Sequence, residues 1–129
     1  MKRVNGGFTL VEVMVALVVF AVMASAISIA NTQSIAAARQ IEEQQNARWL
    51  TQNALTELRL SEVLPKPGLS KDKVTLNNNE WTVEIETFNV EVEIIGPFLR
   101  RVEVRAYLEN DESAVDRLHA VIGHVQVTQ

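Results

Sequence analysis

An apolar run over residues 8–30 constrains this chain more than any other feature of its sequence. It holds 23 residues, of which 19 are apolar and one, Glu12, is charged. As a helix it would reach about 35 Å, at roughly 1.5 Å per residue, which is enough to cross a hydrocarbon layer of ~30 Å. Lys2 and Arg3 precede the run and few basic residues follow it closely. We therefore expect a single-pass segment with the N-terminus in the cytoplasm and the C-terminal part across the membrane.

One interpretation of the run is an ordinary cleaved signal peptide. Lys2 and Arg3 would form its basic region, residues 13–23 its apolar region, and residues 24–26 its Ala-Ser-Ala cleavage pattern. Glu12 opposes this interpretation, because a carboxylate near the membrane costs a few kcal/mol and a disposable segment has no use for one. The other interpretation keeps the helix in the mature protein and gives Glu12 a partner.

Gly7 and the residues that follow it carry a resemblance. Gly7, then Phe-Thr-Leu-Val-Glu at 8–12 and an unbroken apolar run, resembles the start of the type IV pilin class, whose short basic leader ends in Gly. The resemblance implies that a prepilin peptidase cuts between Gly7 and Phe8 and methylates the Phe8 amine, so that residues 1–7 are a leader. It also implies that Glu12 pairs with the N-terminal amine of a neighbouring subunit during assembly. The charges of such a buried pair offset each other, whereas either charge alone would be uncompensated.

A helical pattern continues beyond the apolar run. No Pro or Gly occurs from Phe8 until Pro65, and residues 35–64 are rich in Ala, Gln, Arg, Glu and Leu, which favour helix. We predict one helix over 8–64, ended by the Pro-Lys-Pro-Gly sequence at 65–68. One face of this helix carries apolar residues at spacings of three and four and needs a cover: Ala47, Leu50, Ala54, Leu55 and Leu58.

After residue 68 the apolar period changes from 3.6 to 2. Alternating patterns over 81–86, 90–94, 101–108 and 118–127 predict four antiparallel strands. The last pattern changes parity near Gly123, which indicates a bulge. The apolar faces of these strands need the helical stripe as their partner. The predicted fold class is α+β and pilin-like: a long N-terminal helix, membrane-spanning over 8–30, whose 31–64 part packs on a small antiparallel sheet within 65–129.

Several patterns that could carry chemistry have a simpler structural interpretation. His119 and His124 lie five residues apart in a strand region, which places them on opposite faces unless a bulge realigns them. The four glutamates between 84 and 93 alternate with Val, Ile and other residues as the solvated face of strands. The acidic turn 109–112 has oxygens that could bind calcium, but it lacks the Gly and the ordered acid spacing of a calcium loop. We predict no catalytic, cofactor-binding or metal site, and no enzyme.

Composition excludes further classes of function. Residues 31–129 contain 10 Lys+Arg and 15 Asp+Glu, a balance that opposes nucleic-acid binding because a phosphate backbone attracts clustered cations. The chain has no cysteine. It therefore has no disulfide framework, no thiolate zinc site and no cysteine nucleophile.

The stretch 47–60 narrows the resemblance. Its sequence, Ala-Arg-Trp-Leu-Thr-Gln-Asn-Ala-Leu-Thr-Glu-Leu-Arg-Leu, is similar to a helix typical of the minor pseudopilin I family of the bacterial type II secretion system. The resemblance covers the leader, the membrane helix and this stretch, roughly half the chain. It implies a structural protein of the bacterial inner membrane with a periplasmic C-terminal domain.

The same resemblance implies particular partners. In that family the protein joins two other minor pseudopilins, the J and K types, at the tip of a short periplasmic filament, and is thought to start its assembly. The H-type minor pseudopilin, the major pseudopilin, the prepilin peptidase and inner-membrane lipid complete the implied partners. A minor subunit of a type IV pilus or DNA-uptake filament is the alternative. A secreted binding module that begins at Ile27 is a weaker one, and an enzyme ranks last.

A second apolar line on the helix is the candidate partner interface. It consists of Ile35, Ala38, Ile41 and Trp49. A lone helical aromatic is more often core than interface, but this spacing sets Trp49 apart from the stripe that faces the sheet. We expect the small sheet to leave this line open, and an open apolar line on a periplasmic helix usually marks an interface.

Overall fold

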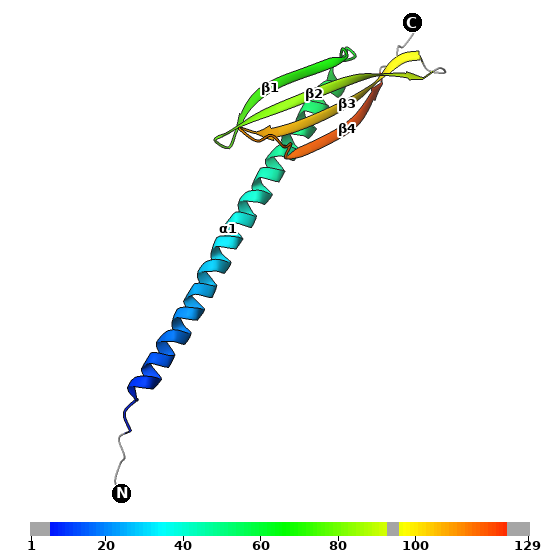
Figure 1. Cartoon of the computed structure of the whole chain (residues 1–129). Helices are drawn as coiled ribbons and strands as arrows, with labels where there is room; N and C mark the ends of the chain where they lie inside the picture. The colour runs from blue at the N-terminus through cyan, green and yellow to red at the C-terminus, as the bar shows by residue number, and fades with distance from the viewer. Residues whose placement is uncertain (1–5, 93–95, 124–129) are drawn as a thin grey trace. The chain divides into compact units, whose positions relative to one another are not determined.

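The computed structural model describes residues 6–92 and 96–123 (Figure 1). One helix precedes four strands: α1 (Leu10–Leu60), β1 (Gly68–Leu76), β2 (Asn79–Val92), β3 (Gly96–Leu108) and β4 (Asp116–Gly123). The chain divides into two compact units, Met1–Gln40 and Ile41–Gln129. The first holds the N-terminal part of α1, and the second holds the rest of the helix and the sheet. The predicted α+β fold class, a long helix with a small antiparallel sheet, is confirmed.

Thr9 and Glu12 define the start of α1. The backbone N–H of Glu12 donates to the Thr9 hydroxyl at 3.2 Å, and the Thr9 N–H donates to the Glu12 carboxylate at 2.9 Å. This reciprocal pair is a capping box, which satisfies two amide groups that the start of a helix leaves without a partner. The helix therefore begins at Leu10, two residues after the predicted start at Phe8.

Ser61 defines the end of α1. The helix ends at Leu60, four residues before its predicted end, with a last bond from Ser61 N–H to the Glu57 carbonyl at 3.0 Å. The Ser61 hydroxyl then donates to the Val63 carbonyl at 3.1 Å and accepts from the Val63 N–H at 3.3 Å. A serine side chain that bonds nearby backbone competes with helical bonds, so the helix stops before it reaches Pro65.

The four strands form one antiparallel sheet in the order β1-β2-β3-β4 (Figure 1). β1 pairs with β2 along its whole length. The two residues of their turn, Asn77 and Asn78, have φ angles of 51° and 63°. A tight type I′ hairpin needs positive φ at both positions, which asparagine tolerates well. The predicted number and antiparallel order of the strands agree with the structure.

The strand boundaries differ from the predicted ones. The separate strands predicted at 81–86 and 90–94 are parts of β2, whose pairing with β3 shifts register between Val90 and Val92. The pairing is continuous from Trp81 to Val90, so Val90 lies on the opposite face to Val83 and Ile85, and one strand whose apolar residues change face had the pattern of two. β1 was not predicted, because its central Ser-Lys-Asp-Lys sequence shows no apolar alternation. Residues 93–95 and 124–129, which include His124 and the far side of the predicted Gly123 bulge, lie outside the described residues.

The core of the second unit lies between α1 and one face of the sheet. On the helix Ala47, Leu50 and Leu55 are buried, and Ala54 and Leu58 are partly buried. The sheet contributes alternating residues of its inner face: Trp81, Val83, Val102, Val104, Ala106 and Ile122. The predicted packing of the helical stripe on the sheet is confirmed.

Candidate functional site

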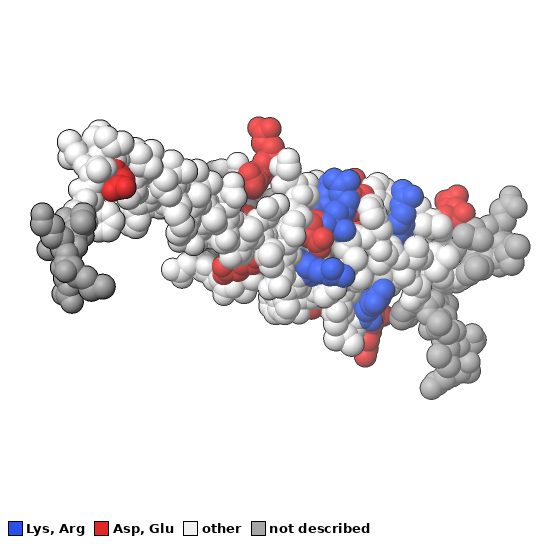
Figure 2. All heavy atoms as spheres, turned by 90° about the horizontal axis from the view of Figure 1, so that it is seen from below, with Lys and Arg blue, Asp and Glu red and all other residues white. Residues whose placement is uncertain are grey.

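The N-terminal unit exposes its apolar side chains. Every described residue from Gly6 to Gln40 is exposed, including the whole predicted span. Figure 2 shows an uncharged surface along this segment with one acidic spot near its N-terminal end. By length and composition α1 can cross a membrane. Apolar surface of this extent is stable in lipid or against other helices, and unstable in water.

The Glu12 carboxylate lies at the N-terminal end of this surface. Within the chain the carboxylate accepts a hydrogen bond from the Thr9 N–H, and its negative charge therefore lies at the positive end of the helix dipole. Phe8 is 90% exposed, and residues 6–9 are not helical. The Gly7–Phe8 bond, the predicted cleavage position, thus lies outside α1. The sequence motif pointed to Glu12 and Phe8 but not to the contact with Thr9.

The candidate interface line on α1 is exposed. Ile41 and Trp49 are each 55% exposed within the second unit, away from the buried stripe. Ile35 is 58% exposed and Ala38 is exposed in the first unit. Trp49 is therefore not part of the core. Of its two interpretations, core residue or surface residue, the structure supports the second.

Thr51 joins the helix to the sheet. It is completely buried, and its hydroxyl lies 2.6 Å from Asp116 Oδ2, to which it donates, and 3.1 Å from the Arg48 carbonyl oxygen. Because Asp116 begins β4, this bond ties the edge of the sheet to the middle of the folded helix segment. Thr51 was not predicted from the sequence, although its position between two apolar stripe residues was a usable signal.

The outer face of the sheet carries a network of ion pairs. Arg105 is its centre: Nε lies 2.9 Å from Glu103 Oε1, Nη1 lies 3.4 Å from Glu84 Oε2, and Nη2 pairs with Glu86. Lys71 on the neighbouring strand also pairs with Glu84. Of the four glutamates predicted to form a solvated face, Glu84 and Glu86 are thus paired with cations on adjacent strands, and Glu93 lies outside the described residues.

The network is charged at neutral pH. A hydrogen bond from Lys71 lowers the pKa of Glu84, and one from Arg105 lowers the pKa of Glu103. Hydrogen bonds to Glu103 and then Glu86 raise the pKa of Arg105. Both carboxylates keep their charge because cations stabilise the ionised form. The arrangement stabilises a polar sheet surface and supplies no free acid–base pair.

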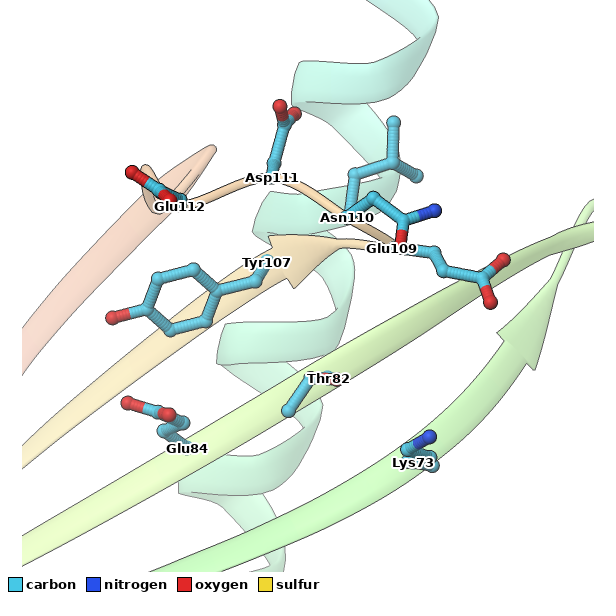
Figure 3. A pocket seen from close by; sticks show the side chains of 9 residues that line it. Lys73, Thr82, Glu84, Tyr107, Glu109, Asn110, Asp111 and Glu112 are labelled. Atoms are coloured by element: carbon cyan, nitrogen blue, oxygen red, sulfur yellow. The ribbon is translucent and has the colours of Figure 1, made fainter.

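The acidic turn between β3 and β4 borders an open hollow of about 470 Å³. Figure 3 shows the carboxylates of Glu109, Asp111 and Glu112 pointing in different directions, with Lys73 across the hollow on β1. Calcium needs several oxygens directed at one point, and these carboxylates do not converge. Across residues 6–92 and 96–123, no group of three His, Cys, Asp or Glu side chains is placed to hold a metal ion.

Comparison with known proteins places these features in a family. Residues 2–28 match the prokaryotic N-terminal methylation motif, and residues 41–123 match type II secretion system (T2SS) protein I. The second match covers most of the folded unit, including the exposed line on α1, the buried stripe and the sheet. The chain belongs to the type II secretion system protein I family.

Three relatives carry the name type II secretion system protein I. The protein from Pseudomonas aeruginosa is 36% identical over 81 residues, which are 63% of this chain and 62% of that one. The Klebsiella pneumoniae protein is 35% identical over 123 residues, 95% of this chain and 98% of that one. The Klebsiella michiganensis protein is 26% identical over 118 residues, covering 92% and 95%.

The family decides between the alternatives left by the sequence. The methylation motif alone is shared by the type IV pilin class, whereas the match over 41–123 is to a secretion-system protein. In this chain, the N-terminal methylation motif and the exposed apolar segment of α1 fit anchoring in the inner membrane. Family membership also implies contact with other components of the pseudopilus.

Proposed function

We propose that the chain is a structural minor pseudopilin that helps to initiate the periplasmic pseudopilus and forms part of its tip. The observation that carries this proposal is the exposed helix surface: an apolar N-terminal segment with a lone acid, followed by an open line beside Trp49 on the folded unit. Surfaces of this kind bury themselves against other helices. The function is assembly, without turnover of a substrate.

The partners that fit this role are other pseudopilins with the same kind of helix. We propose the J-type and K-type minor pseudopilins as direct neighbours, the H type as a further candidate, and the major pseudopilin as the subunit added below them. Ile35, Ala38, Ile41 and Trp49 are the proposed contact residues on this chain. The N-terminus lies in the cytoplasm and residues 65–129 lie in the periplasm.

Glu12 has two successive partners in this proposal. In the free subunit its carboxylate accepts the Thr9 N–H, a contact observed at 2.9 Å. After cleavage at Gly7–Phe8 and methylation of Phe8, assembly brings the amine of a neighbouring subunit close to Glu12. The stronger ion pair then replaces the capping bond, because two opposite charges buried in lipid stabilise each other more than a charge and an amide do.

A complementation experiment tests the function. A strain lacking the gene receives the wild-type chain, Glu12→Val or the control Glu42→Val, which removes an exposed acid from the same helix outside the apolar segment. Exported proteins in the medium are measured together with the amount of each variant in the membrane. Glu12→Val should insert normally but lose most of the secretion, and Glu42→Val should secrete like wild type. Equal secretion by all three strains would refute the role of Glu12.

A further inference from the structure

Two arginines of α1 in the second unit, Arg48 and Arg59, have no acidic partner among the described residues. The side chains of Arg48 and Arg59 are exposed, and neither forms an ion pair with any residue of 6–92 or 96–123. The arginines on β3 behave differently. Arg105 is paired with three glutamates, and the Arg101 guanidinium lies 4.9 Å from the ring centroid of Phe88. The open guanidinium groups are therefore a particular feature of the helix.

The two arginines lie on one line along the helix. They are separated by 11 residues in the sequence, which is close to three turns and about 16 Å at roughly 1.5 Å per residue. Trp49 lies next to Arg48 in the sequence and is 55% exposed. The exposed positions one turn from Arg48 are the glutamines 44, 45 and 52, which neutralise no charge. We call Arg48 and Arg59 the basic edge.

The basic edge is an exception on an acidic unit. Residues 41–129 contain nine Lys+Arg and 15 Asp+Glu. A second acidic surface is repelled by this unit as a whole, because like charges raise the free energy of the encounter. A face with unpaired cations attracts it locally. The basic edge therefore orients the approach of an acidic partner, which the net negative charge of the unit opposes.

Resting on the proposed function, we propose that the basic edge selects the neighbouring subunit. Its occupant is the parallel helix of another pseudopilin that carries carboxylates along the edge facing Arg48 and Arg59. Trp49 and Ile41 supply the apolar contact, and the guanidinium groups set register and exclude helices without acids at those positions. Trp and Arg are the residue types most enriched where interfaces concentrate their binding energy.

Co-purification of the full chain tests this inference. The tagged chain is co-expressed with the J-type and K-type pseudopilins of the same bacterium, extracted in detergent and captured at NaCl concentrations from low to high. Variants are Arg48→Glu, Arg59→Glu and Arg48→Lys, with Lys66→Glu as the matched control. Lys66 is exposed in the linker and undergoes the same change of charge. Folding of each variant is checked by its melting temperature.

Reversal of either basic-edge charge should lower the captured pseudopilin by about tenfold at low salt, because an interface charge mainly affects steering and partner choice. Arg48→Lys and Lys66→Glu should capture amounts of pseudopilin near those of wild type. Capture by wild type should decline as the NaCl concentration rises, and capture by Arg48→Glu should decline less. Normal capture by both reversal variants would overturn the basic edge and leave the proposed function intact. Failure of wild type to capture any pseudopilin, or cross-linking of two copies through this face, would overturn both assignments.

Discussion

Replacement of two adjacent helix residues tests which side of α1 is core and which is interface. Leu50 is 4% exposed and packs in the core, whereas Trp49 is 55% exposed and lies on the opposite side. Leu50→Ala removes buried methyl and methylene groups, and such a change costs about 2–5 kcal/mol, depending on how far the site collapses. Trp49→Ala removes a larger side chain but little buried contact, so its effect on stability should stay within about 0.5 kcal/mol.

These free energies translate into melting temperatures. For a unit the size of residues 41–129, about 1 kcal/mol corresponds to roughly 4–8 °C. A loss of ~3 kcal/mol in Leu50→Ala should therefore lower the midpoint by about 12–24 °C, while Trp49→Ala should shift it by no more than about 4 °C. Trp81 is 1% exposed in the core and reports unfolding by fluorescence in both variants. Circular dichroism of the same samples provides a second signal.

Association should respond in the opposite way. Trp49→Ala should weaken capture of the other minor pseudopilins by about 2 kcal/mol if it is a main anchor of the interface. At temperatures where Leu50→Ala is still folded, that variant should capture them like wild type. If Trp49→Ala unfolds the unit while Leu50→Ala is harmless, the core and interface sides of the helix have been assigned the wrong way round.

Three further predictions concern processing, the helix–sheet bond and acid stability. The mature protein should begin with N-methylated Phe8, and intact-mass measurement of the membrane fraction would contradict this by finding a chain that starts at Ile27. Thr51→Val should destabilise the folded unit by about 1–3 kcal/mol because it leaves the Asp116 carboxylate without its donor; Thr51→Ser keeps the hydroxyl and should melt near wild type. Glu84 and Glu103 on the outer sheet face have pKa values below the ordinary 4.5 in the folded state, so folded protein binds fewer protons than unfolded protein, and stability should fall as pH decreases below about that value. Arg105→Gln should be less stable at neutral pH and show a flatter acid-side loss in melts recorded from pH 7 to pH 3, whereas a loss as steep as in wild type would argue against the network.

Local sequence determined the helical half of this protein. The apolar run 8–30, the spacing of the stripe from Ala47 to Leu58, and the absence of Pro and Gly before Pro65 depend on near neighbours in the chain. Helical bonds join residues four apart, so a pattern read along the chain describes the structure directly. The motif at 7–12 is local for the same reason, which is why cleavage and methylation positions could be predicted without a fold.

Tertiary structure decided how the strands pair and which surfaces stay open. β1 exists as an edge strand because the Asn77-Asn78 turn folds it back on β2, although its own sequence shows no strand pattern. Strand pairing depends on partners far along the chain, so alternation alone cannot distinguish one strand whose apolar residues change face from two strands.

The same distinction applies to the candidate interface. Sequence placed Trp49 on a line apart from the stripe, but its exposure depends on how far the sheet extends around the helix. The bond from Thr51 to Asp116, 65 residues away, could be found only after folding brought the two together. Local periodicity thus determined the elements, whereas long-range packing decided their partners, because burial is a property of the assembled fold and not of any one segment.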